Sequence, residues 1–231
     1  MKWLLAQGAD VNAKAHGESV LEVTLSSMTN ADLEDRAPVV KALIMAGAKI
    51  TPAARKAVQV AYSAFDYHRE AMAPAFRKKG EAAAVALCTF LGVEPPKPRI
   101  MHDGKSAIAV PKGTVAKQFE TLWNLLVPSS GAAKTAQGEV VRIAGRINLE
   151  LSRNGGMNWD AQYRKMAKAF ARRIASGTPV DDELLAEAST SIASIIKSPR
   201  QDHVQELCRI AIAWVRANPK PIKCGPVDYD R

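Results

Sequence analysis

Two copies of one pattern constrain most strongly what the first third of this chain can fold into. The first copy spans residues 2–14 (KWLLAQGADVNAK) and the second spans residues 39–52 (VVKALIMAGAKITP). In both, apolar side chains at helical spacing lead to a Gly-Ala pair, where glycine takes the backbone conformation that ends a helix. Because Gly8 and Gly47 lie 39 residues apart, the pattern predicts a stack of similar helical units.

Both segments resemble the end of one ankyrin repeat and the turn into the next. The sequence departs from that family in two ways. The spacing exceeds the usual ~33 residues, and Ser19-Val20-Leu21-Glu22 stands where the family usually has Thr-Pro-Leu-His. The resemblance implies an interaction platform that seldom carries chemistry. It implies a protein-binding surface on the turns and the inner helix face, near Asp10, Asn12, His16 and Lys49.

We assign residues 1–94 to about two and a half such repeats. A polar insertion at residues 28–35 accounts for the long period, a helix is expected over residues 53–69, and a closing helix over residues 81–91. The first copy lacks a preceding helix, which leaves an apolar end at Trp3, Leu4 and Leu5. We expect a missing repeat, the C-terminal domain or a second copy of the chain to cover it, and homo-oligomers if nothing else does.

The rest of the chain predicts a helical bundle, so the expected fold class is all-α: a degenerate ankyrin-like solenoid followed by the bundle. Residues 95–113 are Pro-rich at their start and are expected to form a linker, with room for one β-hairpin. Apolar spacing and capping signals predict a bundle over residues 114–219, with helices at residues 115–126, 135–153, 160–175, 181–197 and 200–217. A loosely held tail, residues 220–231, follows.

The second predicted bundle helix carries a stripe of charges of alternating sign. A solvated, ion-paired surface, a groove that binds a polar group, and a buried network all remain open as explanations. Gly145 in mid-helix favours a close approach by another backbone or by a ligand. The candidate groove residues are Gln137, Glu139, Arg142, Arg146, Glu150, Asn154, Asn158 and Asp160.

Positive charge is concentrated in the second half. The chain has a net charge of +9, of which residues 1–94 contribute 11 Lys/Arg against 10 Asp/Glu and residues 95–231 contribute 21 against 13. The third bundle helix lines up five cations opposite an apolar face. This basic patch consists of Arg164, Lys165, Lys168, Arg172 and Arg173. Such a helix can follow phosphates or bind an acidic protein, and a solvated surface without a ligand is the alternative.

Signatures of enzymes are missing from the sequence. The four histidines are scattered, no glycine loop carries the residues that bind phosphate, and the three cysteines lack metal-like spacing. We therefore expect no catalytic residues, no metal and no cofactor. No apolar run approaches the ~20 residues that span a bilayer. With no secretory signal expected and reduced thiols, the cytoplasm is the expected compartment.

We expect a non-enzymatic protein-protein interaction module, such as an adaptor, inhibitor or immunity-type protein of bacterial or phage origin. The sequence leaves two alternatives. One is a nucleic-acid-binding protein that uses the basic helix at residues 160–175. The other is a cryptic enzyme or nucleotide-binding domain that uses the Glu/Arg stripe at residues 139–153.

Overall fold

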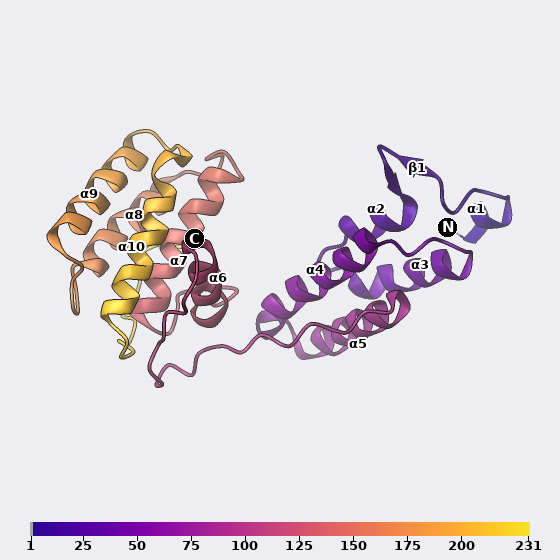
Figure 1. The fold of residues 1–231 in the computed structure, drawn as a ribbon, viewed down its shortest axis with the longest axis horizontal. Helices are drawn as coiled ribbons and strands as arrows, with labels where there is room; N and C mark the ends of the chain where they lie inside the picture. The colour runs from indigo at the N-terminus through magenta and orange to yellow at the C-terminus, as the bar shows by residue number, and fades with distance from the viewer. Residues whose placement is uncertain (1) are drawn as a thin grey trace. The chain divides into compact units, whose positions relative to one another are not determined.

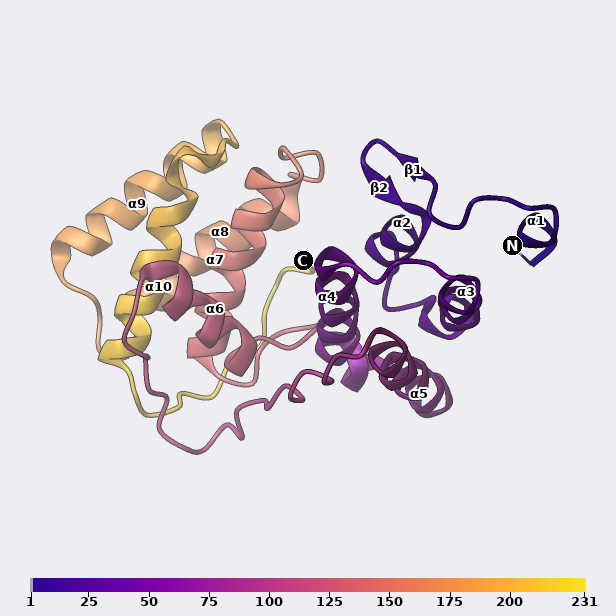
Figure 2. The ribbon, with the colours of Figure 1, turned by 45° about the vertical axis from the view of Figure 1, so that its right-hand side comes forward.

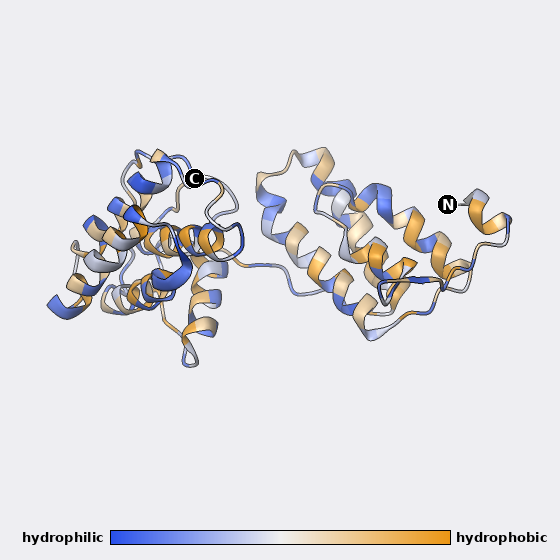
Figure 3. Cartoon of the chain, turned by 90° about the horizontal axis from the view of Figure 1, so that it is seen from above, coloured by the Kyte–Doolittle hydropathy of each residue, from blue (hydrophilic) through white to orange (hydrophobic). Residues whose placement is uncertain are grey.

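The computed structural model describes residues 2–231 and is all-α apart from one short hairpin (Figure 1). The chain divides into two compact units, Met1–Arg99 and Ile100–Arg231. Each unit has its own core of buried apolar side chains. Helices in both units show hydrophobic and hydrophilic bands (Figure 3), as expected of amphipathic helices that bury one face.

The N-terminal unit stacks helices beside a projecting hairpin (Figure 2). Its elements are α1 (Lys2–Ala6), β1 (Lys14–Ala15), β2 (Glu18–Ser19), α2 (Val20–Ser26), α3 (Leu33–Met45), α4 (Pro52–His68), a 3-10 turn (Arg69–Ala71) and α5 (Pro74–Leu91). β1 and β2 are antiparallel, with Lys14 opposite Ser19. Helix α4 packs against α2 and α5, and α3 packs against α5. Val40, Phe65 and Leu87 are among the side chains buried between them.

Two capping residues explain where α2 and α4 begin. Ser19 caps α2, and the Glu22 carboxylate accepts hydrogen bonds from the Ser19 N–H (2.7 Å) and the Ser19 hydroxyl (2.8 Å), which completes a capping box. Thr51 caps α4 ahead of Pro52, and its hydroxyl donates to the other oxygen of Glu22 at 2.6 Å. One carboxylate therefore joins the starts of α2 and α4.

The segment proposed as an insertion is partly helical, because α3 begins at Leu33, whose side chain is buried. One expectation about this unit needs correction. The closing helix expected from residue 81 already begins at Pro74. Gly80 lies within it because a Cβ there would come within 2.5 Å of the Phe65 ring, so glycine permits the close packing of α4 and α5.

The C-terminal unit is a bundle built around one central helix. It contains α6 (Val115–Leu126), α7 (Ala136–Ser152), α8 (Ala161–Ile174), α9 (Asp182–Lys197), a 3-10 turn (Gln201–His203) and α10 (Val204–Ala217). Helix α7 contacts α6, α8 and α10. Ile143, Phe170 and Trp214 are fully buried in its core. The five predicted helices are confirmed, although the last begins at Val204 after the 3-10 turn.

Residues 95–113 form no strand, but several of their backbone N–H groups donate hydrogen bonds to distant residues. The Arg99 N–H donates to the buried Asp66 carboxylate in the N-terminal unit. In the C-terminal unit the N–H groups of His102 and Ile108 donate to the carbonyls of Leu125 and Pro219, both at 2.8 Å. The hairpin considered for this segment is therefore not formed, and the Ile108 side chain belongs to the core of the bundle.

Candidate functional site

The start of α7 is covered by residues 219–231, which we call the C-terminal strap. The Ala136 N–H donates to the Ile222 carbonyl (2.7 Å), and the Cys224 N–H donates to the Lys134 carbonyl (3.1 Å). The first N–H groups of any helix lack partners within the helix, so the strap supplies an acceptor that α7 needs. The expectation of a loosely held tail is therefore wrong.

Gln137 fixes the strap through both ends of its side-chain amide. Its Nε2 donates to the carbonyls of Asn218 (2.8 Å) and Lys220 (2.7 Å), and its Oε1 accepts from the Ile222 N–H (3.1 Å). The side chain is fully buried. Gln137 therefore acts as a backbone clamp, and no part of its amide faces an open groove.

Glu139 and Arg142 form a buried ion pair that also engages the strap. Arg142 donates to Glu139 through Nη2 (2.8 Å) and Nε (3.0 Å), while the Tyr229 hydroxyl donates to Oε1 of Glu139 at 2.6 Å. The Ala133 N–H also donates to this carboxylate, and Arg142 donates to the Arg231 carbonyl. Burial raises the pKa of Glu139, but the hydrogen bonds and charge of Arg142 outweigh it, so the pKa lies below its ordinary value.

Glu150, near the other end of α7, organises the loop that leads to α8. Its carboxylate accepts from the Asn158 N–H (2.6 Å) and from the side-chain amides of Asn154 (3.0 Å) and Asn158 (3.2 Å). Asp160 then caps α8 by accepting from the N–H groups of Gln162 and Tyr163. These polar side chains shape a turn and the start of a helix.

Gly145 is explained by packing inside the bundle. A Cβ at this position would lie 2.2 Å from a ring carbon of Trp123 on α6. The close neighbour inferred from the sequence is therefore an aromatic side chain, and neither a backbone nor a ligand is needed to account for the glycine.

The proposed polar groove thus divides into two clusters whose members bond to other residues of the chain. Gln137, Glu139 and Arg142 hold the strap, whereas Glu150, Asn154 and Asn158 shape the loop. Asp160 caps α8 and also pairs with the Arg231 guanidinium of the strap. Arg146 is half-buried between them, and its Nε is buried without a hydrogen-bond partner. Sequence reasoning missed Tyr229, because nothing in a short polar segment signals a partner 90 residues away.

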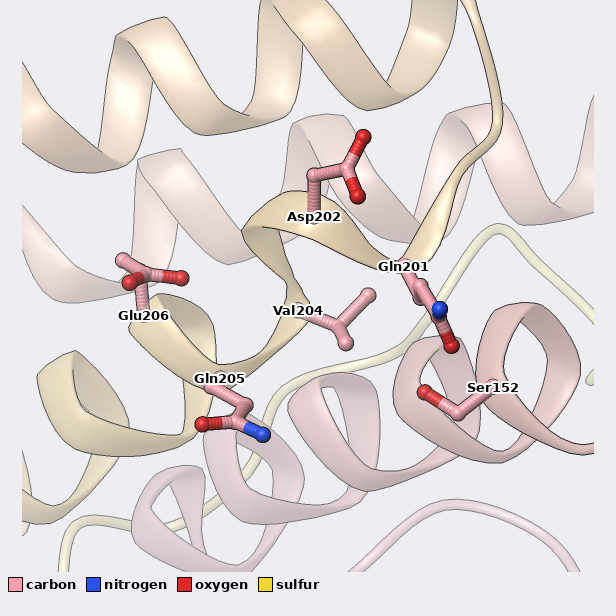
Figure 4. Close-up of a pocket in the computed structure, with 6 residues that line it drawn as sticks. All are labelled: Ser152, Gln201, Asp202, Val204, Gln205 and Glu206. Carbon is pink, nitrogen blue, oxygen red and sulfur yellow. The ribbon is translucent and has the colours of Figure 1, made fainter.

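A hollow elsewhere in the bundle has a volume of about 350 Å³ and is lined by Ser152, Gln201, Asp202, Val204, Gln205 and Glu206. Figure 4 shows Gln201 beside Ser152, whereas Asp202 and Glu206 point away from them. The polar groups therefore do not converge on one point. Across residues 2–231 the structure shows no group of three or more His, Cys, Asp or Glu side chains that could hold a metal ion.

The basic patch on α8 splits into an exposed part and an inner residue. Arg164, Lys165, Lys168 and Arg172 are exposed at the helix surface, whereas Arg173 is half-buried. Arg173 lies on the side of α8 that faces the strap. Burial raises the pKa of Tyr229 and of Cys224 in the strap, and the positive charge of Arg173 opposes that rise. Four of the five predicted cations therefore share one solvent-facing surface.

In the N-terminal unit, Asn12 connects the two similar turns. Its Nδ2 donates to the Gly47 carbonyl (3.1 Å), and its Oδ1 accepts from the Lys49 N–H (2.9 Å). Asp10 accepts from the Asn12 N–H, and His16 lies in the hairpin turn with a positive φ of 53°. The side chains of Asp10, His16 and Lys49 are exposed. Of the four predicted binding residues, Asn12 therefore has a structural role and the other three face solvent.

The fold and the sites describe an all-α protein of two helical units. Most of its candidate polar side chains form hydrogen bonds or ion pairs with other residues of the same chain. Comparison of the chain with protein-family models, curated proteins and solved structures finds no match. Within the described residues, every helix is too short or too polar to cross a membrane.

Proposed function

We propose that the N-terminal unit is an ankyrin-type interaction module that binds a protein partner. The observation that carries the proposal is the bond between its turns. By joining the first turn to the carbonyl of Gly47 and the N–H of Lys49, Asn12 holds two successive turns in register. This leaves Asp10, His16 and Lys49 exposed on a preorganised surface, and preorganisation lowers the entropic cost of binding.

We place the centre of this surface at exposed apolar side chains of α2 and α4. Val23 on α2 and Val60 on α4 are 43% and 60% exposed, and α2 packs against α4. The hairpin runs directly into α2, so charged and polar groups border these helices. An apolar centre with a polar rim is the usual anatomy of a protein-binding surface.

The second unit is proposed to be a basic accessory domain of the same binding protein. The whole chain would act as an adaptor, inhibitor or immunity-type protein of a bacterium or phage. Its three cysteines are free, which suits the reducing cytoplasm.

The test is capture of a partner by the intact chain from a bacterial lysate, with and without nuclease, followed by affinity measurements with the recovered protein. We expect Val60→Asp to weaken binding about tenfold or more, because a charge would be buried without a partner at the centre of the contact. Val85→Asp is the matched control, since Val85 is 41% exposed on α5, outside the proposed surface on α2 and α4.

Equal affinity for Val60→Asp and the unmodified chain would contradict the proposed surface. If no protein is captured after nuclease treatment, the proposal that the partner is a protein is contradicted. Circular dichroism of both variants checks that the helices remain folded.

A further inference from the structure

One face of α8 carries positive charge without large apolar side chains. The face consists of Arg164, Lys165, Lys168 and Arg172, and we call it the α8 cationic face. The large apolar side chains of this helix, such as Met166 and Phe170, are buried on the opposite side. After the cap at Asp160, α8 contains no acidic residue.

These cations are almost unpaired. The Arg172 guanidinium lies 3.8 Å from the Asp228 carboxylate of the strap, and both side chains are more than half exposed. Among residues 2–231 the structure shows no ion pair for Arg164, Lys165 or Lys168. Exposed pairs such as Arg172–Asp228 contribute little free energy, so the face keeps its charge for a ligand.

The spacing of the cations suits a row of negative charges. Arg164, Lys168 and Arg172 follow one another at four-residue steps, so each step advances about 6 Å along the helix axis. Three cations therefore span about 12 Å. A nucleic-acid duplex carries one phosphate per ~1.7 Å of its axis, which places about seven phosphates along that length.

We propose that the α8 cationic face binds the phosphate backbone of double-stranded nucleic acid. A folded acidic protein fits less well, because the centres of protein interfaces are enriched in aromatic and apolar residues and depleted in lysine. The α8 face has no exposed side chain of that kind to offer such a centre. Contacts to phosphates alone give binding without sequence preference, steeply weakened by salt. This inference stands independently of the protein-binding surface proposed for the other unit.

The strap contributes one competing group to this face. The Asp228 carboxylate occupies the Arg172 end of the row, where a phosphate would otherwise approach. Its removal frees Arg172 and lowers the local negative charge. Asp228→Asn is therefore expected to bind a duplex about twofold to threefold more tightly, an effect on the order of a single exposed ion pair.

The experiment titrates the intact chain into a fluorescent DNA duplex of about 20 base pairs and follows anisotropy between about 50 and 200 mM salt. With about four phosphate contacts, affinity should fall roughly 150-fold over that range. Arg164→Gln/Lys168→Gln/Arg172→Gln should lose most of the binding and most of the salt dependence. The matched control is Lys117→Gln/Lys197→Gln/Arg200→Gln, which removes equal charge from other parts of the same unit.

Three results would overturn the proposal: no duplex binding at the lowest salt concentration, equal losses in both triple variants, or competition by poly-L-glutamate as effective as that by unlabelled duplex. The last result would assign the face to acidic polypeptides. Asp230→Asn serves as the control for Asp228→Asn, because Asp230 lies in the same part of the strap and forms no ion pair with α8 in the described chain. Thermal unfolding establishes that each variant is folded.

Discussion

At the residue scale, single polar side chains join segments that are far apart in the chain. Asn12 links two turns, Glu22 links the starts of α2 and α4, and Asn218 pairs with both backbone groups of Thr178 at 2.8 Å. Each uses more than one atom of its polar group. Removing such a side chain leaves several groups without partners, which costs more than the loss of one hydrogen bond.

Glu22 makes the N-terminal unit sensitive to acid. Hydrogen bonds from the Ser19 backbone, and then from Thr51 and the Ser19 hydroxyl, lower its pKa from 4.5 to about 2. A group whose pKa is lowered by folding stabilises the fold above its unfolded pKa. That contribution is lost as pH falls from about 4.5 toward 2. We expect Glu22→Gln to lower the melting temperature at about pH 6 and to flatten its pH dependence between about pH 5 and 3.

Circular dichroism melts across that range of pH measure this effect. Glu18→Gln, at an exposed position of β2 four residues earlier, is the control. Parallel pH profiles for Glu22→Gln and the unmodified chain would show that Glu22 does not link the two helix starts in solution.

At the element scale, the strap completes the bundle without being helical. It covers the buried Glu139–Arg142 pair with Tyr229 and is held by the clamp at Gln137. A buried ion pair that loses part of its hydrogen bonding becomes costly, so the strap and the pair depend on each other. The reactivity of the Cys224 thiol can be used to detect opening of the strap, because this residue is half-buried within it.

We expect Gln137→Ala to loosen the strap. The substitution leaves the carbonyls of Asn218 and Lys220 and the Ile222 N–H without the clamp, at a cost of about 1–3 kcal/mol. An opening equilibrium shifts about tenfold for each ~1.4 kcal/mol, so alkylation of Cys224 at mildly alkaline pH should accelerate at least several-fold. Mass spectrometry of the cysteine peptides separates Cys224 from the buried Cys88 and Cys208.

Gln118→Ala provides the matched control, because Gln118 donates to the Pro111 carbonyl and touches no part of the strap by a hydrogen bond in the described residues. Burial raises the pKa of Cys208 to about 12, so its alkylation should stay slow in every variant. Unchanged labelling of Cys224 in Gln137→Ala would show that the strap does not depend on the clamp.

At this scale, sequence reasoning could predict features set by local interactions but not those set by contacts between residues far apart in the chain. The helices of the bundle were predictable because apolar spacing, Thr and Asp caps and Pro or Gly stops are local signals. The strap and the buried pair were not, because Glu139 and Tyr229 lie 90 residues apart and each resembles a surface residue. Gly145 signalled a close neighbour, but only the fold shows that it is Trp123.

At the scale of the whole molecule, two separate cores stabilise one chain. One core is formed by residues between Leu21 and Leu91 and the other by residues between Ile108 and Tyr229. Neither set includes a residue of the other unit. Since cooperativity in unfolding comes from shared burial, each unit should unfold in its own transition.

A pair of matched core substitutions tests this separation. Leu43 and Leu207 are 1% and 0% exposed, each in a different core. Leu43→Ala and Leu207→Ala should each cost about 2–5 kcal/mol through lost burial and a residual cavity. In a unit of about 100 residues this lowers the melting temperature by roughly 8 °C or more. Differential scanning calorimetry should show a different one of two transitions shifting in each variant. A single transition that both substitutions shift equally would show instead that the two cores unfold as one cooperative system.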